Sequence, residues 1–282
     1  MRRIIVTALT ACIAATGPQL SPLCHAGEVQ RVLLIGQGPD GHPRSTHEYN
    51  AAAGLLAKLL SRTQQLQAIP VSADGKWKQG PELLDGADTA VVFVSQGAAW
   101  IQEDERRLEA FQRLAKRKGG LLCLHWGMGT RDAKNIKAFV DLFGGCHGGP
   151  DRRYKVVDVR TKLVGGSHPV LRGIAPLDVH EEFYFKLKTP GQKAAGQWTP
   201  LIRVNIEDED HAVSWAWERP DGGRSFGFSG LHFHENWKHE EYRRLITQAI
   251  LWTLDRKIPG DGVEVPIDSS DLELPDQTPA KK

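Results

Sequence analysis

The stretch Gly119-Gly-Leu-Leu-Cys-Leu-His125-Trp-Gly-Met-Gly129 decides the fold class of this chain of 282 residues. Its apolar run predicts a buried strand, the small residues behind it predict a sharp turn, and the apolar spacing over 133–143 predicts a helix. A strand, a tight turn and a helix lift one side chain above the carboxyl edge of an α/β sheet, as in a nucleophile elbow. That side chain is His125. Because imidazole is not the acyl nucleophile of such elbows, we expect the architecture of a catalytic site with altered chemistry.

The chain before this elbow alternates between strands and helices. The predicted order is Arg31–Gly36 (strand), 46–60 (helix), Gln67–Val71 (strand), Asp88–Ser95 (strand) and 103–118 (helix). Thr46 is expected to cap the first helix. The alternation predicts an α/β fold, a largely parallel sheet flanked by helices on both faces. Functional side chains should then gather at the carboxyl ends of the strands.

The second half of the chain has a different pattern. Closely spaced strand candidates, several of them antiparallel, lie at Tyr154–Arg160, Val179–Lys186, Leu201–Asn205, His211–Trp217 and Ser225–Ser229. A helix over 240–254 closes the domain, which we expect to span 27–258. The Pro-, Asp- and Ser-rich residues 259–282 are predicted to form a surface tail.

The amino terminus has the pattern of a secretory signal. Arg2 and Arg3 precede an apolar run, 4–17, which is too short to span a membrane. Cys24-His25-Ala26 offers small residues at the positions that a signal peptidase reads. We therefore expect residues 1–26 to be removed, no membrane insertion of the mature chain, and a periplasmic or secreted protein.

The net charge limits the classes of binding partner, and the cysteine content bears on disulfide pairing. Removing 1–26 takes away two arginines and no acids, which leaves 34 basic and 34 acidic residues. A formally neutral chain argues against nucleic acid and anionic membranes as partners. Cys123 and Cys146 remain, and the sequence leaves open whether they pair or are buried thiols. A homodimer is also left open.

Several histidines fall where predicted strands end. His125 lies at the elbow, His147 in a glycine-flanked loop, and His232 and His234 after the strand that ends at 229. We expect His125, His147 and His232 to converge, with Glu182 or its neighbour Glu181 as the nearby acid. Neutral imidazoles suit one divalent metal, Zn²⁺ first, with an open position for water or a substrate oxygen. Without a metal, the same groups suit acid–base chemistry near neutral pH.

Other motifs refine this expectation. His47 follows the first strand and is expected to line the pocket, whereas His42 is expected to face solvent. Gly36-Gln37-Gly38 lacks the rest of a dinucleotide fingerprint, so no nucleotide cofactor is expected.

Some tryptophans are candidates for sugar binding, because flat aromatic rings stack on the apolar faces of sugars. They are Trp100, Trp126, Trp215, Trp217 and Trp237.

Together these residues resemble a ThuA-like protein of the trehalose-utilisation family, with a class I glutamine-amidotransferase-like (flavodoxin-like) fold. The matching stretches are Val32–Gly36, Asp88–Ser95, Gly119–His125, Phe143–His147, Ser167–Val170, His180–Tyr184 and Gly223–His232. The resemblance implies a role in carbohydrate metabolism on oxidised sugars or glycosides, with a His-rich pocket and in some members a metal. The family's recurrent polar residues correspond to His125, His147, Glu182, Tyr184 and His232. Leu231 stands where glycine is frequent in the family.

The expected function is a hydrolase, lyase or isomerase acting on a keto-sugar or glycoside. Catalysis is assigned to His125, Glu182 and His232, and the metal to His125, His147 and His232. Substrate binding is assigned to His47, Trp126, Tyr184 and His234. One alternative is a non-catalytic carbohydrate-binding protein, in which the tryptophans matter more than the histidines. A degenerate amidotransferase-type hydrolase using Cys123 is a weaker alternative, because His125 occupies the elbow.

Overall fold

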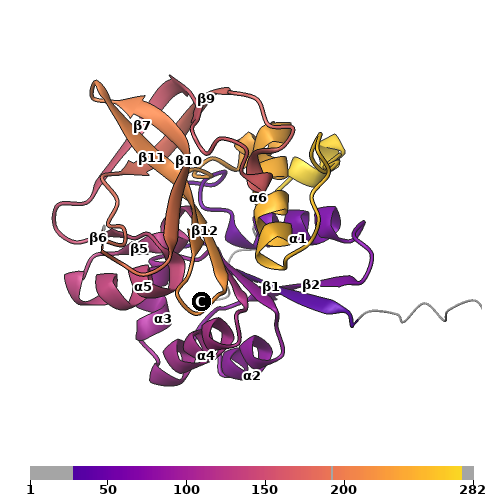
Figure 1. Ribbon diagram of the computed structural model, residues 1–282, viewed down its shortest axis with the longest axis vertical. Helices are drawn as coiled ribbons and strands as arrows, with labels where there is room; N and C mark the ends of the chain where they lie inside the picture. Colours follow the sequence, from indigo (N-terminus) through magenta and orange to yellow (C-terminus); the bar gives the residue numbers. More distant parts are fainter. Residues whose placement is uncertain (1–27, 192, 275–282) are drawn as a thin grey trace, which may run out of the picture.

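An eight-stranded sheet forms the centre of the molecule (Figure 1). The computed structural model describes residues 28–191 and 193–274, so the predicted signal segment 1–26 lies outside the described residues. Across the sheet the strands are β2 (Leu66–Ser72), β1 (Gln30–Gly36), β3 (Thr89–Val92), β4 (Gly120–Leu124), β12 (Arg224–Phe228), β11 (Glu209–Glu218), β10 (Gln197–Ile206) and β8 (Lys162–Leu163). The first five run parallel and the last three join antiparallel, which confirms the predicted α/β class.

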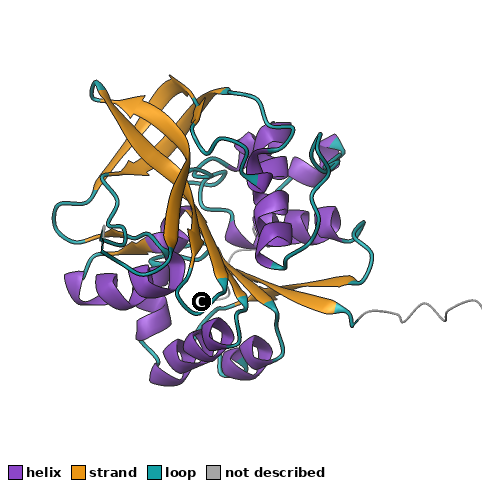
Figure 2. Cartoon of the chain, in the orientation of Figure 1, coloured by secondary structure: helices purple, strands orange, loops and turns teal. Residues whose placement is uncertain are grey.

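Helices cover both faces of this sheet (Figure 2). One face carries α1 (Tyr49–Leu60) and α6 (Glu240–Thr253), and the other carries α2 (Gly80–Asp85), α3 (Gly97–Gln102), α4 (Glu105–Lys116) and α5 (Ile136–Phe143). Side chains alternate between the faces of a strand, so Val32 and Leu34 pack with α1 and α6. Leu33 and Ile35 pack on the opposite side. The continuous apolar run of β1 therefore serves two cores.

Two small sheets lie outside the main one. β7 (Arg153–Arg160) pairs antiparallel with β9 (Asp178–Phe185), and β5 (Gly129–Thr130) pairs parallel with β6 (His147–Gly148). Short 3₁₀ turns, η1 to η5, occupy His125–Met128, Ala133–Asn135, Pro169–Leu171, His234–Lys238 and Ser269–Leu272. Through these small sheets, β6 and β9, which follow β4 in the sequence, return to the neighbourhood of its carboxyl end.

One local prediction was wrong. Thr46 does not cap α1, which begins at Tyr49 after Glu48; its hydroxyl instead donates to the carbonyl of Pro43. The predicted sharp turn after β4 is present as the 3₁₀ turn η1, and the predicted helix over 133–143 consists of η2 and α5.

The segment after α6 lies on the surface but is attached to the body. Most of 259–274 is exposed, yet Val265 is buried and its carbonyl accepts from Arg243 Nε at 2.8 Å. Lys58 of α1 pairs with Asp271. Cys123 and Cys146 are buried free thiols here. Among the residues that the structure describes, we find no helix with the length and apolar character that a membrane span requires.

Candidate functional site

The elbow histidine occupies the carboxyl end of β4. His125 is fully buried and has a φ of 43°, a left-handed conformation that L-residues rarely adopt. Its Nδ1 lies 2.8 Å from the carbonyl oxygen of Ser229. Because a carbonyl can only accept, Nδ1 carries the proton and Nε2 presents a lone pair. The strained backbone and this hydrogen bond aim Nε2 at the space above the sheet edge.

A second histidine comes from the loop after β1. His47 is buried, and its backbone N–H donates to the carbonyl of His232 at 3.0 Å. Thr46 and Phe233 form an isolated antiparallel bridge beside this contact. The loops after β1 and β12 are thereby held together, although they lie far apart in the sequence. His47 and His232 meet for this reason.

Asp40 fixes the orientation of His47. His47 Nδ1 lies 3.1 Å from Asp40 Oδ2, to which the Tyr49 hydroxyl also donates at 2.7 Å. Burial would raise the pKa of Asp40, but hydrogen bonds from His47, Tyr49 and His42 hold it well below its usual range. The ionised carboxylate accepts from Nδ1, so His47 Nε2 carries the lone pair. Asp40 was not identified from the sequence.

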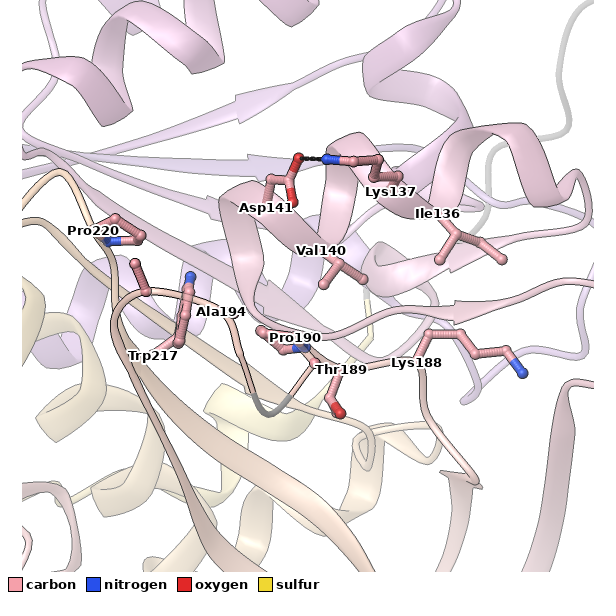
Figure 3. Close-up of a pocket in the computed structure, with 12 residues that line it drawn as sticks. Ile136, Lys137, Val140, Asp141, Lys188, Thr189, Pro190, Ala194, Trp217 and Pro220 are labelled. Atoms are coloured by element: carbon pink, nitrogen blue, oxygen red, sulfur yellow. Dashed lines mark hydrogen bonds and ion pairs between the residues drawn. The ribbon is translucent and has the colours of Figure 1, made fainter.

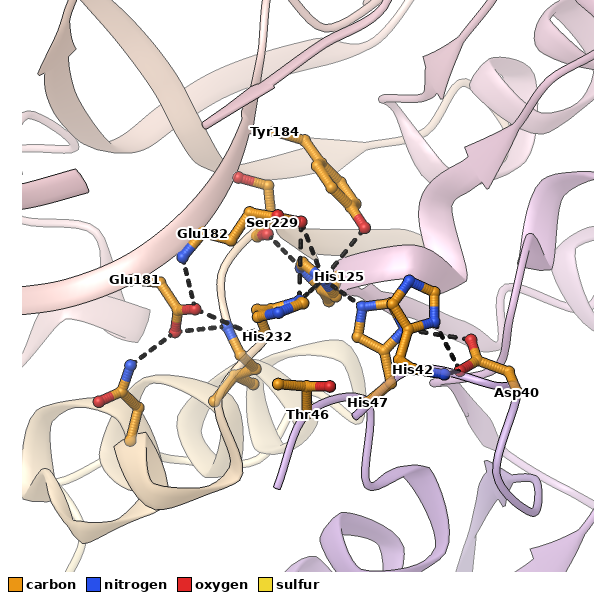
Figure 4. Close-up of polar contacts among 12 residues, drawn as sticks. Asp40, His42, Thr46, His47, His125, Glu181, Glu182, Tyr184, Ser229 and His232 are labelled. Atoms are coloured by element: carbon orange, nitrogen blue, oxygen red, sulfur yellow. Dashed lines mark hydrogen bonds and ion pairs between the residues drawn. The ribbon is translucent and has the colours of Figure 1, made fainter. Parts of the chain in front are cut away.

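Four side chains converge at one point (Figure 4). His125 Nε2 lies 3.0 Å from His47 Nε2 and 3.2 Å from His232 Nδ1. Glu182 Oε1 lies 3.8 Å from His125 Nε2 and 3.6 Å from His232 Nδ1. Three imidazoles with a carboxylate are a donor set that zinc and similar divalent ions accept. Carboxylate and carbonyl partners on the far nitrogens are typical of metal-binding histidines.

Burial sets the protonation of this cluster. It lowers the pKa of His125 well below its ordinary value and that of His232 to about 3, and neighbouring histidines add to both shifts. Burial also raises the pKa of Glu182 to about 7. The imidazoles are therefore neutral at pH 7, as metal ligation requires, and Glu182 is poised to exchange a proton near neutrality.

The two adjacent acids of β9 have different roles. Since strand side chains alternate, Glu182 faces the cluster while Glu181 is fully buried on the other side. Glu181 accepts from the backbone N–H groups of Leu231 at 2.8 Å and His232 at 3.0 Å. Leu231 has a φ of 76°, which most residues avoid. Glu181 thus holds a strained turn that positions His232.

The cluster lies in a pocket of about 310 Å³. Its walls include Trp126 and Tyr184, whose hydroxyl lies 3.0 Å from His125 Nε2. His147 stacks on Tyr184 with ring centroids 4.0 Å apart. The full lining is His42, His47, Trp126, Arg131, His147, Arg152, Tyr154, Glu182, Tyr184 and His232.

The structure changes part of the predicted site. His147 lines the pocket but lies outside the converging group, because it sits behind the Tyr184 ring; His47 is in the group instead. His234 is buried and absent from the pocket wall, since η4 carries it toward η5. His42 is exposed, as expected, and it also lines the pocket and contacts Asp40.

Two alternative site assignments lose support. Trp100, Trp215, Trp217 and Trp237 are buried and do not line the candidate pocket, although Trp217 borders another hollow; Trp126 is also buried but borders the candidate pocket. Cys123 is fully buried, and burial raises the pKa of its thiol well above the ordinary value. A protonated thiol inside a strand is not a nucleophile.

A larger hollow of about 470 Å³ lies elsewhere, between α5 and residues 188–191 (Figure 3). Ile136, Val140 and Trp217 line it, and Lys137 pairs with Asp141 at its edge. No histidine or cysteine contributes to its wall. Its charged side chains are already paired, Lys137 with Asp141 and Lys188 with Asp151, and none belongs to a candidate metal-binding group among the described residues, so the smaller pocket is the candidate site.

Comparisons with known proteins agree with this fold. A ThuA-like protein from Bacteroides uniformis is 16% identical, with a TM-score of 0.60 over 83% of this chain and 95% of its own. A cytoplasmic protein from Salmonella typhimurium is 15% identical, with a TM-score of 0.52 over 79% of this chain and 98% of its own. The β-galactosidase Gan42B is 9% identical, with a TM-score of 0.51 over 82% of this chain but only 30% of its own. At such identities these likenesses show the fold alone.

No curated protein sequence matches this chain. The model of the ThuA family, described as trehalose utilisation, matches residues 32–253. This range contains the main sheet except for Gln30 and Arg31 at the start of β1, and it contains every member of the His/Glu group. The chain belongs to the ThuA, trehalose-utilisation family.

Proposed function

We propose that this protein is a metal-dependent enzyme that acts on a keto-sugar or glycoside, as a hydrolase, lyase or isomerase. The supporting observation is the convergence of three imidazoles beside a carboxylate. His125 Nε2 lies 3.0 Å from His47 Nε2 and 3.2 Å from His232 Nδ1, and Glu182 Oε1 lies 3.6 Å from His232 Nδ1. Membership of the ThuA family supports a carbohydrate-related role. The three imidazoles would hold the ion, and a bound divalent ion supplies polarisation of a sugar oxygen.

Glu182 is the proton-transfer group in this proposal. Glu182 Oε1 lies 3.8 Å from His125 Nε2 and 3.6 Å from His232 Nδ1, farther than His125 Nε2 lies from the nearest nitrogens of His47 and His232. Glu182 also lines the pocket. With its pKa raised to about 7 by burial, Glu182 Oε1 can take a proton from the carbon next to a sugar carbonyl. The Tyr184 hydroxyl stays protonated, because burial raises its pKa well above the ordinary value. It can therefore donate a hydrogen bond to a developing oxyanion.

Metal content tests the ligand set directly. We expect near-stoichiometric zinc, manganese or a similar ion in the purified protein, and its loss in His47→Ala and His232→Ala. His147→Ala and His234→Ala are matched controls, because both histidines are buried outside the converging group. No ion after reconstitution, or equal content in all variants, would refute the proposed centre.

Glu182→Gln separates proton transfer from ligation. We expect this variant to keep its ion and to lose turnover of a panel of 3-keto-glycosides. Loss of the ion would make Glu182 a ligand instead. If the loaded wild-type protein binds sugars without turnover, it is a carbohydrate-binding protein, the alternative function.

Export is part of the proposal. The pattern of residues 1–26 supports removal of a signal and a periplasmic or secreted site of action. Sequencing the mature amino terminus after expression in a Gram-negative host tests it, with Gly27 as the expected first residue. An intact Met1 on the folded protein would exclude cleavage.

A further inference from the structure

Two arginines line the candidate pocket together with the His/Glu group. Arg131 directly follows β5, and Arg152 lies on the loop that follows β6. These strands pair in register, Gly129 with His147 and Thr130 with Gly148. The pairing of two short strands therefore brings both guanidinium groups to one pocket.

Neither guanidinium is neutralised within the described ranges 28–191 and 193–274. Arg152 donates only to the carbonyl of Gly149, at 3.2 Å, and Arg131 forms no hydrogen bond or ion pair there. The acids adjacent in sequence already have partners. Asp132 pairs with Lys134 at 3.0 Å, and Asp151 pairs with Lys188 at 2.5 Å.

The positive charge of Arg152 reaches the pocket interior. Burial, with the charge of Arg152 added, lowers the pKa of His147 to about 3. Glu182, the carboxylate of the pocket wall, lies instead within 3.8 Å of His125 and His232 and pairs with neither arginine. A guanidinium carries five N–H donors in a fork that fits a carboxylate or phosphate. The pocket thus has guanidinium donors that no described acid uses and that an anion can occupy.

We propose that the substrate is an acidic sugar, whose carboxylate or phosphate group binds Arg131 and Arg152 while its reacting end faces the His/Glu group. This inference rests on the proposed function and names its substrate class. Both anionic groups present the oxygens that a pair of guanidinium groups binds, so the experiment distinguishes between them. Two charged contacts in a partly enclosed pocket should be worth about tenfold or more in affinity.

Calorimetric binding of D-glucuronate, D-glucose 6-phosphate and D-glucose to the full mature protein tests the proposal. We expect at least one anionic sugar to bind about tenfold or more tightly than glucose. In the double variant Arg131→Gln/Arg152→Gln the preference should disappear. The tighter of the two anionic sugars identifies the group as a carboxylate or a phosphate. Arg153→Gln is the matched control, an exposed neighbour outside the pocket wall, and should keep the preference.

Three results would overturn the proposal: binding of neither anionic sugar, equal affinity for all three sugars, or a preference that survives in the double variant. Loss of preference in Arg153→Gln as well would also count against it. Measuring the metal content of the same samples distinguishes failure of the acidic-sugar proposal from failure of the proposed metal-dependent function. A loaded protein without anion preference refutes only the substrate class, whereas a metal-free protein that retains the preference refutes only the metal-dependent mechanism.

Discussion

The Nε2 atoms of His47 and His125 lie 3.0 Å apart, and the far nitrogen of each ring already faces an acceptor. Asp40 accepts from His47, and the Ser229 carbonyl accepts from His125. With both rings neutral, two lone pairs point at each other, an arrangement that a cation relieves. The hydrogen bonds around the pair therefore direct both lone pairs toward the point that the proposed ion would occupy.

Asp40→Asn should weaken metal binding without removing a ligand. An amide can turn its N–H toward the ring and no longer supplies a negative charge, so His47 loses the partner that fixes its tautomer. We expect the affinity for zinc to fall by about 10- to 100-fold, measured by competition with a chelator. Asp74→Asn is the control, because Asp74 binds the same loop at Gly38 but contacts no histidine of the group. An unchanged affinity in Asp40→Asn would refute the orienting role.

The metal-free protein should lose stability as the pH falls below neutrality. The pKa of His147 is lowered to about 3 by burial, whereas in the unfolded chain it is near 6.5. Between these values the unfolded state binds the extra proton, so the free energy of unfolding decreases as the pH falls from 6.5 toward 3. One such histidine contributes a slope of about 1.4 kcal/mol per pH unit.

His147→Gln should reduce that slope, measured by urea unfolding with a chelator present at pH 7, 6 and 5. His180→Gln, a change at an exposed histidine on β9, should leave the slope as in wild type. Equal slopes for wild type and His147→Gln would mean that His147 takes up its proton in the folded state.

Arg219→Lys should destabilise the protein by about 2–4 kcal/mol. The guanidinium of this buried arginine donates to the carbonyls of Arg224 and Gly119 and to the hydroxyl of Ser225. A lysine ammonium cannot reach all these acceptors from one position, so buried carbonyls lose their donors. Arg113→Lys, in an exposed pair with Asp85, should change stability by less than about 1 kcal/mol. Similar effects of the two changes in urea unfolding would contradict this reading.

Gly97→Ala should disturb the turn behind the elbow. A Cβ at Gly97 would lie 2.2 Å from the carbonyl oxygen of Gly127, in the turn that begins at His125. Because that contact is to backbone, the turn must shift, and we expect a loss of about 1–3 kcal/mol together with weaker metal binding. Gly54→Ala in α1 has open space around it and should instead stabilise by about 0.5–1 kcal/mol. Chemical denaturation and chelator competition on both variants decide this.

The sequence predicts the parts of the site that follow from periodicity. A buried strand with a histidine at its end identifies His125, and the same reasoning identifies His232. It places His47 only on the pocket wall and not in the converging group, where His147 was expected instead. Parallel strands share one carboxyl edge, so their end residues meet without knowledge of any contact. The α/β class is predicted for the same reason.

Other features depend on tertiary contacts that leave no periodic signal. Asp40 lies in a loop rich in glycine and proline, where only the fold shows which histidine it contacts. His147 shares the glycine-flanked pattern of a ligand, yet the Tyr184 ring separates it from the group. Arg131 and Arg152 are brought together by two strands of two residues each, too short to predict.

The bridge between Thr46 and Phe233 has a consequence for how the protein is made. The group draws its members from both ends of the domain, His47 near the start and His232 close to the last helix. A nascent chain in which β12 and the loop after it have not yet left the ribosome lacks His232, so its His/Glu group is incomplete. The proposed ion could therefore bind to the complete group only at the last stage of folding, after nearly the whole polypeptide has been synthesised.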